Sequence, residues 1–219
     1  MDPLVLYVGE RNVSSWSMRA YLGLLHKQLP FEERLVELVA GRGDATLARV
    51  SPTGLVPVLH HGPIVVPDSL AILEYLEETF PPRDHPALWP LDSCERARAR
   101  WLAATMHSGF AALRAGMSFH TCFWPERPLA DAAARADATA LLELLERVLA
   151  DAPPRGPFLV GEFGAADILY APALVRLEAY RVPTAATRRA ADYMRTVLAH
   201  PTVRRWLDEA RALPPVLEE

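Results

Sequence analysis

Three serines lie close to a tryptophan near the start of the chain, in the stretch ERNVSSWSMRAYLGL. Apolar residues recur after Trp16 at helical spacing, so Ser14, Ser15 and Ser17 fall at the amino-terminal end of a predicted helix. A serine here is an ordinary N-cap when its hydroxyl accepts a hydrogen bond from a free backbone N–H. The same hydroxyl can instead donate to a bound anion, which the free amides and the helix dipole also favour. The stretch therefore predicts either capping or anion chemistry.

A second group of chemically suggestive residues lies in SPTGLVPVLHHGPIVVPDSLAILEYL. Pro57 opens a predicted central strand, where its missing amide removes a ladder hydrogen bond. A cis bond between Val56 and Pro57 would turn the backbone, so that Val56 offers its own N–H and C=O to a bound peptide. Asp68 and Ser69 begin the next predicted helix, where free amides favour a bound carboxylate. Plain N-capping by the serine is the structural alternative.

The elements that position these residues differ between the two halves of the chain. Residues 1–80 combine short strands and helices in the predicted order strand, helix, strand, short helix, strand, strand, helix. The following stretch FPPRDHPALWPLD contains four prolines, which interrupt helices and central strands, so we place a linker at 81–92. Residues 93–219 show helical spacing almost throughout. The predicted fold class is an α/β domain followed by an all-α domain.

Composition narrows the range of functions. The 219 residues are 51% hydrophobic, which is enough for one long domain or two short ones. Lysine and arginine total 23 against 27 acidic residues, so the net charge of −4 argues against nucleic acid as the main partner. The sequence shows neither an export signal nor a membrane-spanning run, and we expect a soluble cytoplasmic protein.

The cysteines and histidines predict neither redox nor metal chemistry. Cys94 and Cys122 are far apart and form no C-x-x-C motif, so ordinary reduced thiols are expected. His60 and His61 are neighbours on a predicted strand and would point to opposite faces. We therefore predict no metal site.

Taken together, these segments resemble the glutathione S-transferase superfamily over nearly the whole chain. SPTGLVPVL resembles its cis-proline loop, PDSLAILEYL the loop that holds the γ-glutamyl end of glutathione, and GEFGAADILYAP the start of a buried helix. Each motif is weak alone, but their order and spacing match the family. The resemblance implies a thioredoxin-like glutathione-binding domain at 1–80, a linker at 81–92, and an all-helical domain at 93–219 that carries the electrophile site.

The third motif is a folding signal. Gly164 stands where the family usually has Ser or Thr, and Asp167 reaches back to the amide of the N-cap residue. Because glycine supplies no side-chain oxygen, half of the capping box is lost. We expect Asp167 to be buried and structural.

The resemblance implies glutathione as co-substrate and gives the serines a role. A free thiol has a pKa of about 8.5, so only a small fraction is thiolate at neutral pH. SSWSMRAYLGL resembles the zeta-type pattern SSCSxRVxxAL, whose first serine stabilises the thiolate. This role falls on Ser14, with Ser15 as a second donor, while Ser17, Tyr7 and purely structural capping remain alternatives. The implied glutathione-binding residues are Ser15, Val56, Pro57, Asp68 and Ser69.

The electrophile is expected against the first long helix of the second domain. Met106, His107, Phe110 and Arg114 lie about one turn apart and would share a face, with core packing as the alternative. Arg114 would also attract an anionic or carbonyl electrophile. The candidate electrophile-site residues are Arg11, Trp16, Met106, His107, Phe110 and Arg114.

The preferred function is therefore transfer of the glutathione thiolate to an electrophilic carbon, in a homodimer as the family implies. One alternative is a glutathione-dependent isomerase of the maleylacetoacetate or maleylpyruvate type. Two departures weaken it: Trp16 replaces the zeta-type cysteine, and the arginine that zeta enzymes use for an anionic substrate would align with Ala179. The other alternative is a non-catalytic interaction protein of the same fold.

Overall fold

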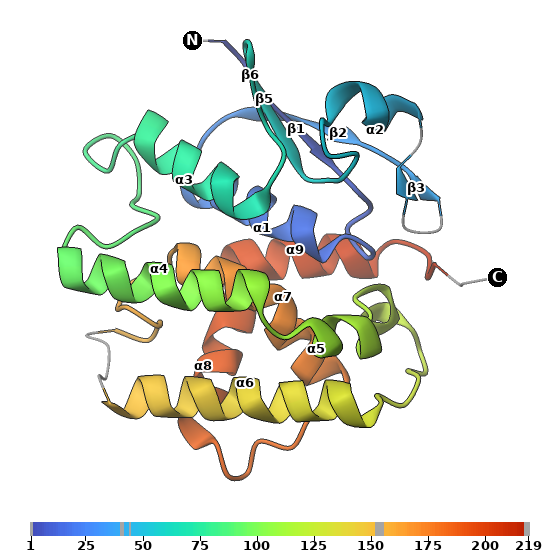
Figure 1. Ribbon diagram of the computed structural model, residues 1–219, viewed down its shortest axis with the longest axis vertical. Coiled ribbons are helices and arrows are strands. Elements are labelled where there is room, and N and C mark those ends of the chain that lie inside the picture. The colour runs from blue at the N-terminus through green and yellow to red at the C-terminus, as the bar shows by residue number, and fades with distance from the viewer. Residues whose placement is uncertain (1, 40–41, 44, 152–155, 217–219) are drawn as a thin grey trace.

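The computed structural model describes residues 2–39, 42–43, 45–151 and 156–216 (Figure 1). Its N-terminal region is built on a mixed four-stranded sheet in the order β2-β1-β5-β6. The central strand β1 runs parallel to β2 and antiparallel to β5, and β5 pairs antiparallel with β6. The strands of this sheet are β1 (Leu4–Val8), β2 (Phe31–Leu35), β5 (Val58–His61) and β6 (Ile64–Val66).

Helices cover both faces of this sheet because β1 is apolar on both sides. Leu6 points into a core shared with α1 (Ser15–His26) and α3 (Ser69–Thr79), whereas Tyr7 packs with Leu47 of α2 (Ala45–Val50). A short ribbon of β3 (Leu38–Val39) and β4 (Arg42–Gly43) precedes α2. The predicted order of strands and helices in this half is confirmed, apart from the β3–β4 ribbon, which the sequence analysis does not predict.

The C-terminal region is helical (Figure 1). Helix α7 lies at its centre and is buried from Ala165 to Leu177, as its apolar sequence predicts. Residues 81–92, between α3 and α4, contain neither helix nor strand. The elements of this region are α4 (Ser93–Ser108), α5 (Ala111–Gly116), the 3₁₀ turn η1 (His120–Phe123), α6 (Ala132–Asp151), α7 (Ala165–Ala179), α8 (Arg188–Ala199) and α9 (Pro201–Arg211).

The prediction of one long helix after the linker is wrong. Helix α4 ends at Ser108, Gly109 is its C-cap in extended conformation, and α5 begins only at Ala111. Phe110, between them, has a φ of 55°, in the left-handed region that a continuing helix cannot use. Met106 and Arg114 therefore belong to different helices and share no single helical face.

Helix α1 joins the two regions. One continuous hydrophobic core contains residues of the sheet, of α1 and of the C-terminal helices. Figure 1 shows α9 running beneath α1, and Trp206 of α9 packs its ring against Tyr21 of α1 with centroids 5.1 Å apart. Within the described residues, every helix is too short or too polar to cross a bilayer.

Candidate active site

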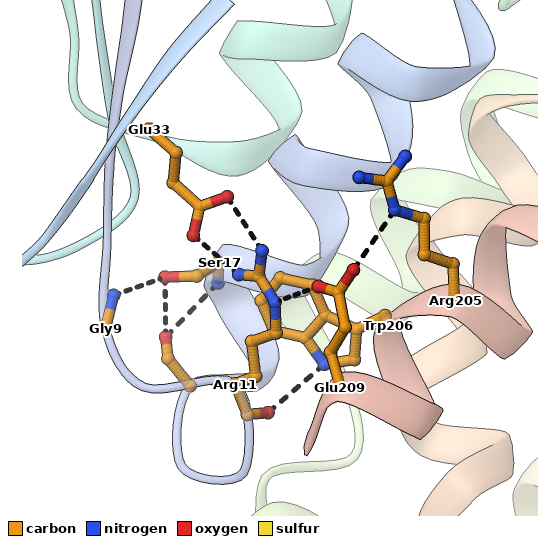
Figure 2. Close-up of polar contacts among 8 residues, drawn as sticks. Gly9, Arg11, Ser17, Glu33, Arg205, Trp206 and Glu209 are labelled. Atoms are coloured by element: carbon orange, nitrogen blue, oxygen red, sulfur yellow. Dashed lines mark hydrogen bonds and ion pairs between the residues drawn. The ribbon is translucent and has the colours of Figure 1, made fainter. Parts of the chain in front are cut away.

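Ser14 is the N-cap of α1. Its backbone is extended, and its Oγ accepts a hydrogen bond from the Ser17 amide at 3.2 Å. The same hydroxyl donates to Ser17 Oγ at 2.8 Å, and Ser17 Oγ accepts from the Gly9 amide at 3.1 Å (Figure 2). Capping is thus present, and the Ser14 proton points into a buried hydrogen-bonded chain. A catalytic Ser14 must rotate this proton toward its ligand.

Ser15 is the first residue of α1, and its hydroxyl faces a different partner. Its Oγ accepts a hydrogen bond from Nη2 of Arg176, on α7, at 3.2 Å. Arg176 is only 5% exposed, and its other donors bind the carbonyls of Met117 at 2.7 Å and Pro172 at 3.1 Å. Because a serine oxygen that accepts still has its own proton to donate, Ser15 keeps a free donor.

Trp16 lies among basic side chains. The guanidinium of Arg19 stacks over its ring at 4.2 Å from the centroid, and that of Arg114 lies at 5.6 Å. His107 of α4 meets the same ring edge-on, with centroids 5.3 Å apart. The structure therefore brings Trp16, His107 and Arg114 together, as candidates from three different helices.

Arg19 is the least expected member of this group. Its side chain is 2% exposed, and its Nε and Nη1 have no hydrogen-bond partner among the described residues. Burial lowers the pKa of Arg19 to about 9, and the charges of Arg176 and Arg114 act in the same direction. Burial likewise lowers the pKa of Arg176 to about 10, with Arg114 adding to the effect.

The second predicted group begins at the proline loop. The peptide bond between Val56 and Pro57 is cis, as predicted. Asp68, and not Ser69, is the N-cap of α3, because its Oδ1 accepts from the amides of Leu70 and Ala71, both at 2.9 Å. The suggestion that Ser69 is the N-cap is therefore wrong.

Asp68 also contacts the C-terminal region. Its Oδ2 lies 3.2 Å from Nε2 of His107. Burial by itself raises the pKa of Asp68, but His107 and the α3 amides outweigh it, so the pKa lies below its usual value. Ser69 is buried, and its Oγ has no hydrogen-bond partner in the described part of the chain.

Arg11 lies in a different place from the other candidates. It pairs with Glu33 through two hydrogen bonds of 2.6 and 2.8 Å, and with Glu209 of α9 at 2.5 Å (Figure 2). Its guanidinium also lies over the rings of Tyr21 and Trp206, at 4.5 and 4.9 Å. Arg11 therefore bridges β2, α1 and α9, and the structure does not bring it to Trp16.

Three further candidates are placed by packing. Met106 is fully buried in the core, as the packing alternative predicts, and Phe110 is partly buried against that core. Tyr7 lies on the sheet face toward α2, where its hydroxyl accepts a hydrogen bond from Arg34 at 3.1 Å. Since α1 covers the opposite face, Tyr7 is not grouped with the serines.

Asp167 is buried, as predicted, and it binds the start of α7. Its carboxylate accepts from the amides of Leu159 at 3.1 Å and Gly164 at 3.0 Å, and from the Tyr193 hydroxyl at 2.9 Å. A Cβ on Gly164 would lie 2.6 Å from the Leu88 carbonyl oxygen, which explains why glycine replaces Ser or Thr here. Burial raises the pKa of Asp167 to about 6, although the hydrogen bonds oppose this.

Comparison with known proteins assigns the family. Residues 13–79 match the family model described as glutathione S-transferase, N-terminal domain. The maleylacetoacetate isomerase of Rattus norvegicus is 32% identical over 184 residues, which cover 81% of this chain and 80% of that protein. The chain belongs to the glutathione S-transferase superfamily. The matched range contains both the serines and residues 67–69, called here the PDS loop.

Solved structures of glutathione S-transferases agree with this assignment. A glutathione transferase homolog from Burkholderia, solved with bound glutathione, has a TM-score of 0.73 at 30% identity, covering 97% of this chain and 100% of that one. A probable maleylacetoacetate isomerase of Caenorhabditis elegans is 38% identical over 109 residues, covering 50% of this chain and 49% of that protein. The chain thus matches about half the length of that relative.

Two arginines near the candidate residues were not predicted from the sequence. Arg19 is not among the candidates, and Arg176 is noted in the sequence only as an arginine one turn before Ala179, the position of the zeta-type arginine. A signal for Arg176 was its position within the apolar run of a helix predicted to be buried. Arg19 follows Trp16 by three residues, which places both side chains on the same side of α1.

Proposed function

We propose that this protein is a glutathione S-transferase that holds the glutathione sulfur as a thiolate at the amino end of α1. The observation that carries the proposal is that His107 of α4 contacts both Trp16, next to the serines, and Asp68 at the start of α3, within a chain of this family. The cis bond between Val56 and Pro57 supports it further. Ser14 would donate to the thiolate, and the free amides of α1 would favour its charge. Enzyme-bound thiolate then attacks an electrophilic carbon of the second substrate.

The glutathione-binding residues proposed are those of the N-terminal region, with residues 1–80 as the glutathione domain and 93–219 as the electrophile domain. Val56 would pair its backbone with the peptide, and Asp68 and Ser69 would bind the γ-glutamyl end at the start of α3. Trp16, His107 and Arg114 would border the electrophile. We further infer a cytoplasmic homodimer that acts in detoxification.

A glutathione-dependent isomerase is the second candidate. It is favoured by the match to the Rattus norvegicus maleylacetoacetate isomerase over most of both chains. In that reaction the thiol adds to the substrate and then leaves, so no conjugate accumulates. Product analysis by mass spectrometry separates the candidates, since a transferase yields the conjugate and an isomerase yields a product of unchanged mass.

The test begins with retention on immobilised glutathione and elution by free glutathione. A panel of electrophiles and peroxides is then assayed with the wild type and Ser14→Ala. We expect the substitution to lower turnover at least about tenfold, because the loss of one hydrogen bond of about 1.4 kcal/mol to an anion corresponds to that factor. Failure of the wild type to bind glutathione would refute the enzyme and favour the non-catalytic alternative.

A matched pair of variants separates chemistry from capping. Ser14→Gly loses the hydroxyl but weakens the N-cap by only a few tenths of a kcal/mol, whereas Ser14→Ala loses both functions. Ser14→Thr keeps both. If Ser14 is catalytic, Ser14→Gly is as inactive as Ser14→Ala, and Ser14→Thr retains activity. Full activity of Ser14→Gly would move the role to Ser15 or Ser17.

A further inference from the structure

Three arginines near the serines carry charges on which acids act only from beyond ion-pair distance, Asp68 on Arg19 and Asp137 on Arg114. Arg19, Arg114 and Arg176, called here the arginine cluster, form no ion pair within the described residues. In the described part of the chain, Arg176 and Arg114 donate hydrogen bonds only to carbonyl or hydroxyl oxygens, and two of the three guanidinium nitrogens of Arg19 have no hydrogen-bond partner. A buried charge is strongly unfavourable unless it is paired. Such a cluster is therefore incomplete without an anion.

The arginine cluster interacts with residues from both parts of the proposed glutathione site. On one side, Arg176 holds the Ser15 hydroxyl at the first turn of α1. On the other, Asp68 is the acid whose charge acts on Arg19, and Asp68 begins the PDS helix. Arg19 follows Ser15 by four residues, so both lie on the same side of α1, and the charge of Asp68 also reaches Arg19.

The two neighbouring serines differ in what they can offer an anion. Ser14 already donates its proton to Ser17. Ser15 accepts from a guanidinium, which polarises its O–H bond and leaves its proton free. A hydroxyl between a cation and an anion is a stronger donor than a hydroxyl between neutral groups.

We propose that Arg176 and Arg19 stabilise the thiolate of bound glutathione, with Ser15 as a second hydroxyl that donates to the sulfur. Arg176 is a positioning residue that acts through Ser15, and Arg19 supplies a nearby positive charge. The S–H bond of glutathione breaks, its electron pair stays on sulfur, and the proton leaves to solvent. The resulting negative charge neutralises part of the arginine cluster. This inference rests on the proposed function, and it adds electrostatic activation to the single hydroxyl of Ser14.

The test is the pKa of the bound thiol, measured by the ultraviolet absorbance of the thiolate during a pH titration of each variant saturated with glutathione. The wild type is expected to lie below the free value of about 8.5. Arg176→Gln and Ser15→Ala should each raise the pKa of the bound thiol by about one unit, which is tenfold less thiolate at low pH. Arg176→Lys keeps the charge but not the planar fork, and should give a smaller rise.

Arg195→Gln is the matched control, because it removes the same charge from an exposed position on α8. Melting temperatures of all variants report folding, and Ser15→Ala tests the proposal even if Arg176→Gln does not fold. Unchanged thiol pKa in Arg176→Gln and Ser15→Ala, with a normal wild-type shift, overturns the inference and leaves Ser14 alone in the role. If the thiol pKa is unchanged but the KM for anionic electrophiles rises, the arginine cluster binds the second substrate, and the inference is also overturned. A wild type that binds glutathione without lowering its pKa refutes the proposed thiolate mechanism itself.

Discussion

Arg11 and Arg19 are eight residues apart in the sequence, yet their surroundings are opposite. Both are largely buried and both stack on aromatic rings. Arg11 pairs with two carboxylates; burial alone would lower its pKa, but Glu33 and Glu209 outweigh burial and raise it. Arg19 pairs with no carboxylate among the described residues, and burial lowers its pKa. A charge with all its partners inside the chain serves the fold, whereas a buried charge without partners indicates a ligand site.

The largest expected effect on stability is at Arg11, the arginine that is paired with carboxylates. Arg11→Ala would leave Glu33 and Glu209 without their cation and remove the stacking on two rings. We expect a loss of about 3 kcal/mol in the free energy of unfolding, near the lower end for a broken buried pair because Glu209 is partly exposed. Urea unfolding with an unchanged m value measures it. A loss no greater than that of the exposed variant Arg195→Ala would contradict the structural role.

Asp167 extends the comparison to a buried acid with full hydrogen bonding. Its pKa in the folded protein, about 6, is above the ordinary value of an aspartate, so folding takes up a proton in the interval between the two. Stability should therefore rise by about 2 kcal/mol as the pH falls from about 7 to about 4, apart from the effect of other groups. Asp167→Asn removes this contribution, and the difference between the two urea unfolding profiles isolates it. If the two profiles run parallel with pH, the pKa of Asp167 is not raised in the folded protein.

Arg19→Met should change the free energy of unfolding in the opposite direction to Arg11→Ala. The substitution replaces an unpaired buried cation by an apolar side chain of similar length, so the unliganded protein should gain about 1 kcal/mol in free energy of unfolding. The gain is limited by the lost stacking on Trp16. Urea unfolding without glutathione measures this gain. A loss as large as that of Arg11→Ala would mean that Arg19 is structurally satisfied, and the comparison would fail.

The smallest effect is expected at the half-exposed pair of Asp68 and His107. His107→Asn should lower stability by less than about 1 kcal/mol near neutral pH. The pKa of Asp68 should move upward toward its usual value, because one of its stabilising partners is lost. A carboxylate whose pKa is lowered by folding stabilises the protein when the pH is above its ordinary pKa, and this stabilisation is lost as the pH falls. The variant should therefore lose less stability than the wild type at acid pH. A carboxyl NMR titration of Asp68 follows this directly, with Glu74→Gln as a surface control.

Much of this fold was predictable from local signals. Helical and strand periodicity gave the element order, and the proline-rich stretch marked where neither helix nor strand forms. The cis-proline loop and the buried Asp167 were found because proline and capping residues have strong positional meaning. The break at Phe110 was missed because a lone glycine followed by an aromatic residue is compatible with a helix.

The candidate site was predictable only in part. The serines and the PDS residues were found as hydroxyls and acids at helix starts, which depend on a few adjacent residues. Arg11 was assigned to the electrophile site because it precedes the serines, but its partner Glu209 lies on α9, near the other end of the chain. A contact between residues so far apart in the sequence cannot be predicted from their positions along the chain.

The sequence by itself determined the fold class, the start of α1 and the family, because these depend on local pattern and on motifs with fixed spacing. Only the tertiary structure decided which arginines are neutralised. Pairing depends on carboxylates brought from other elements of the fold, so Arg11 acquires one from β2 and one from α9, whereas Arg19 pairs with none among the described residues. Burial then makes that difference energetically large, because a low-dielectric interior penalises an unpaired charge far more than water does.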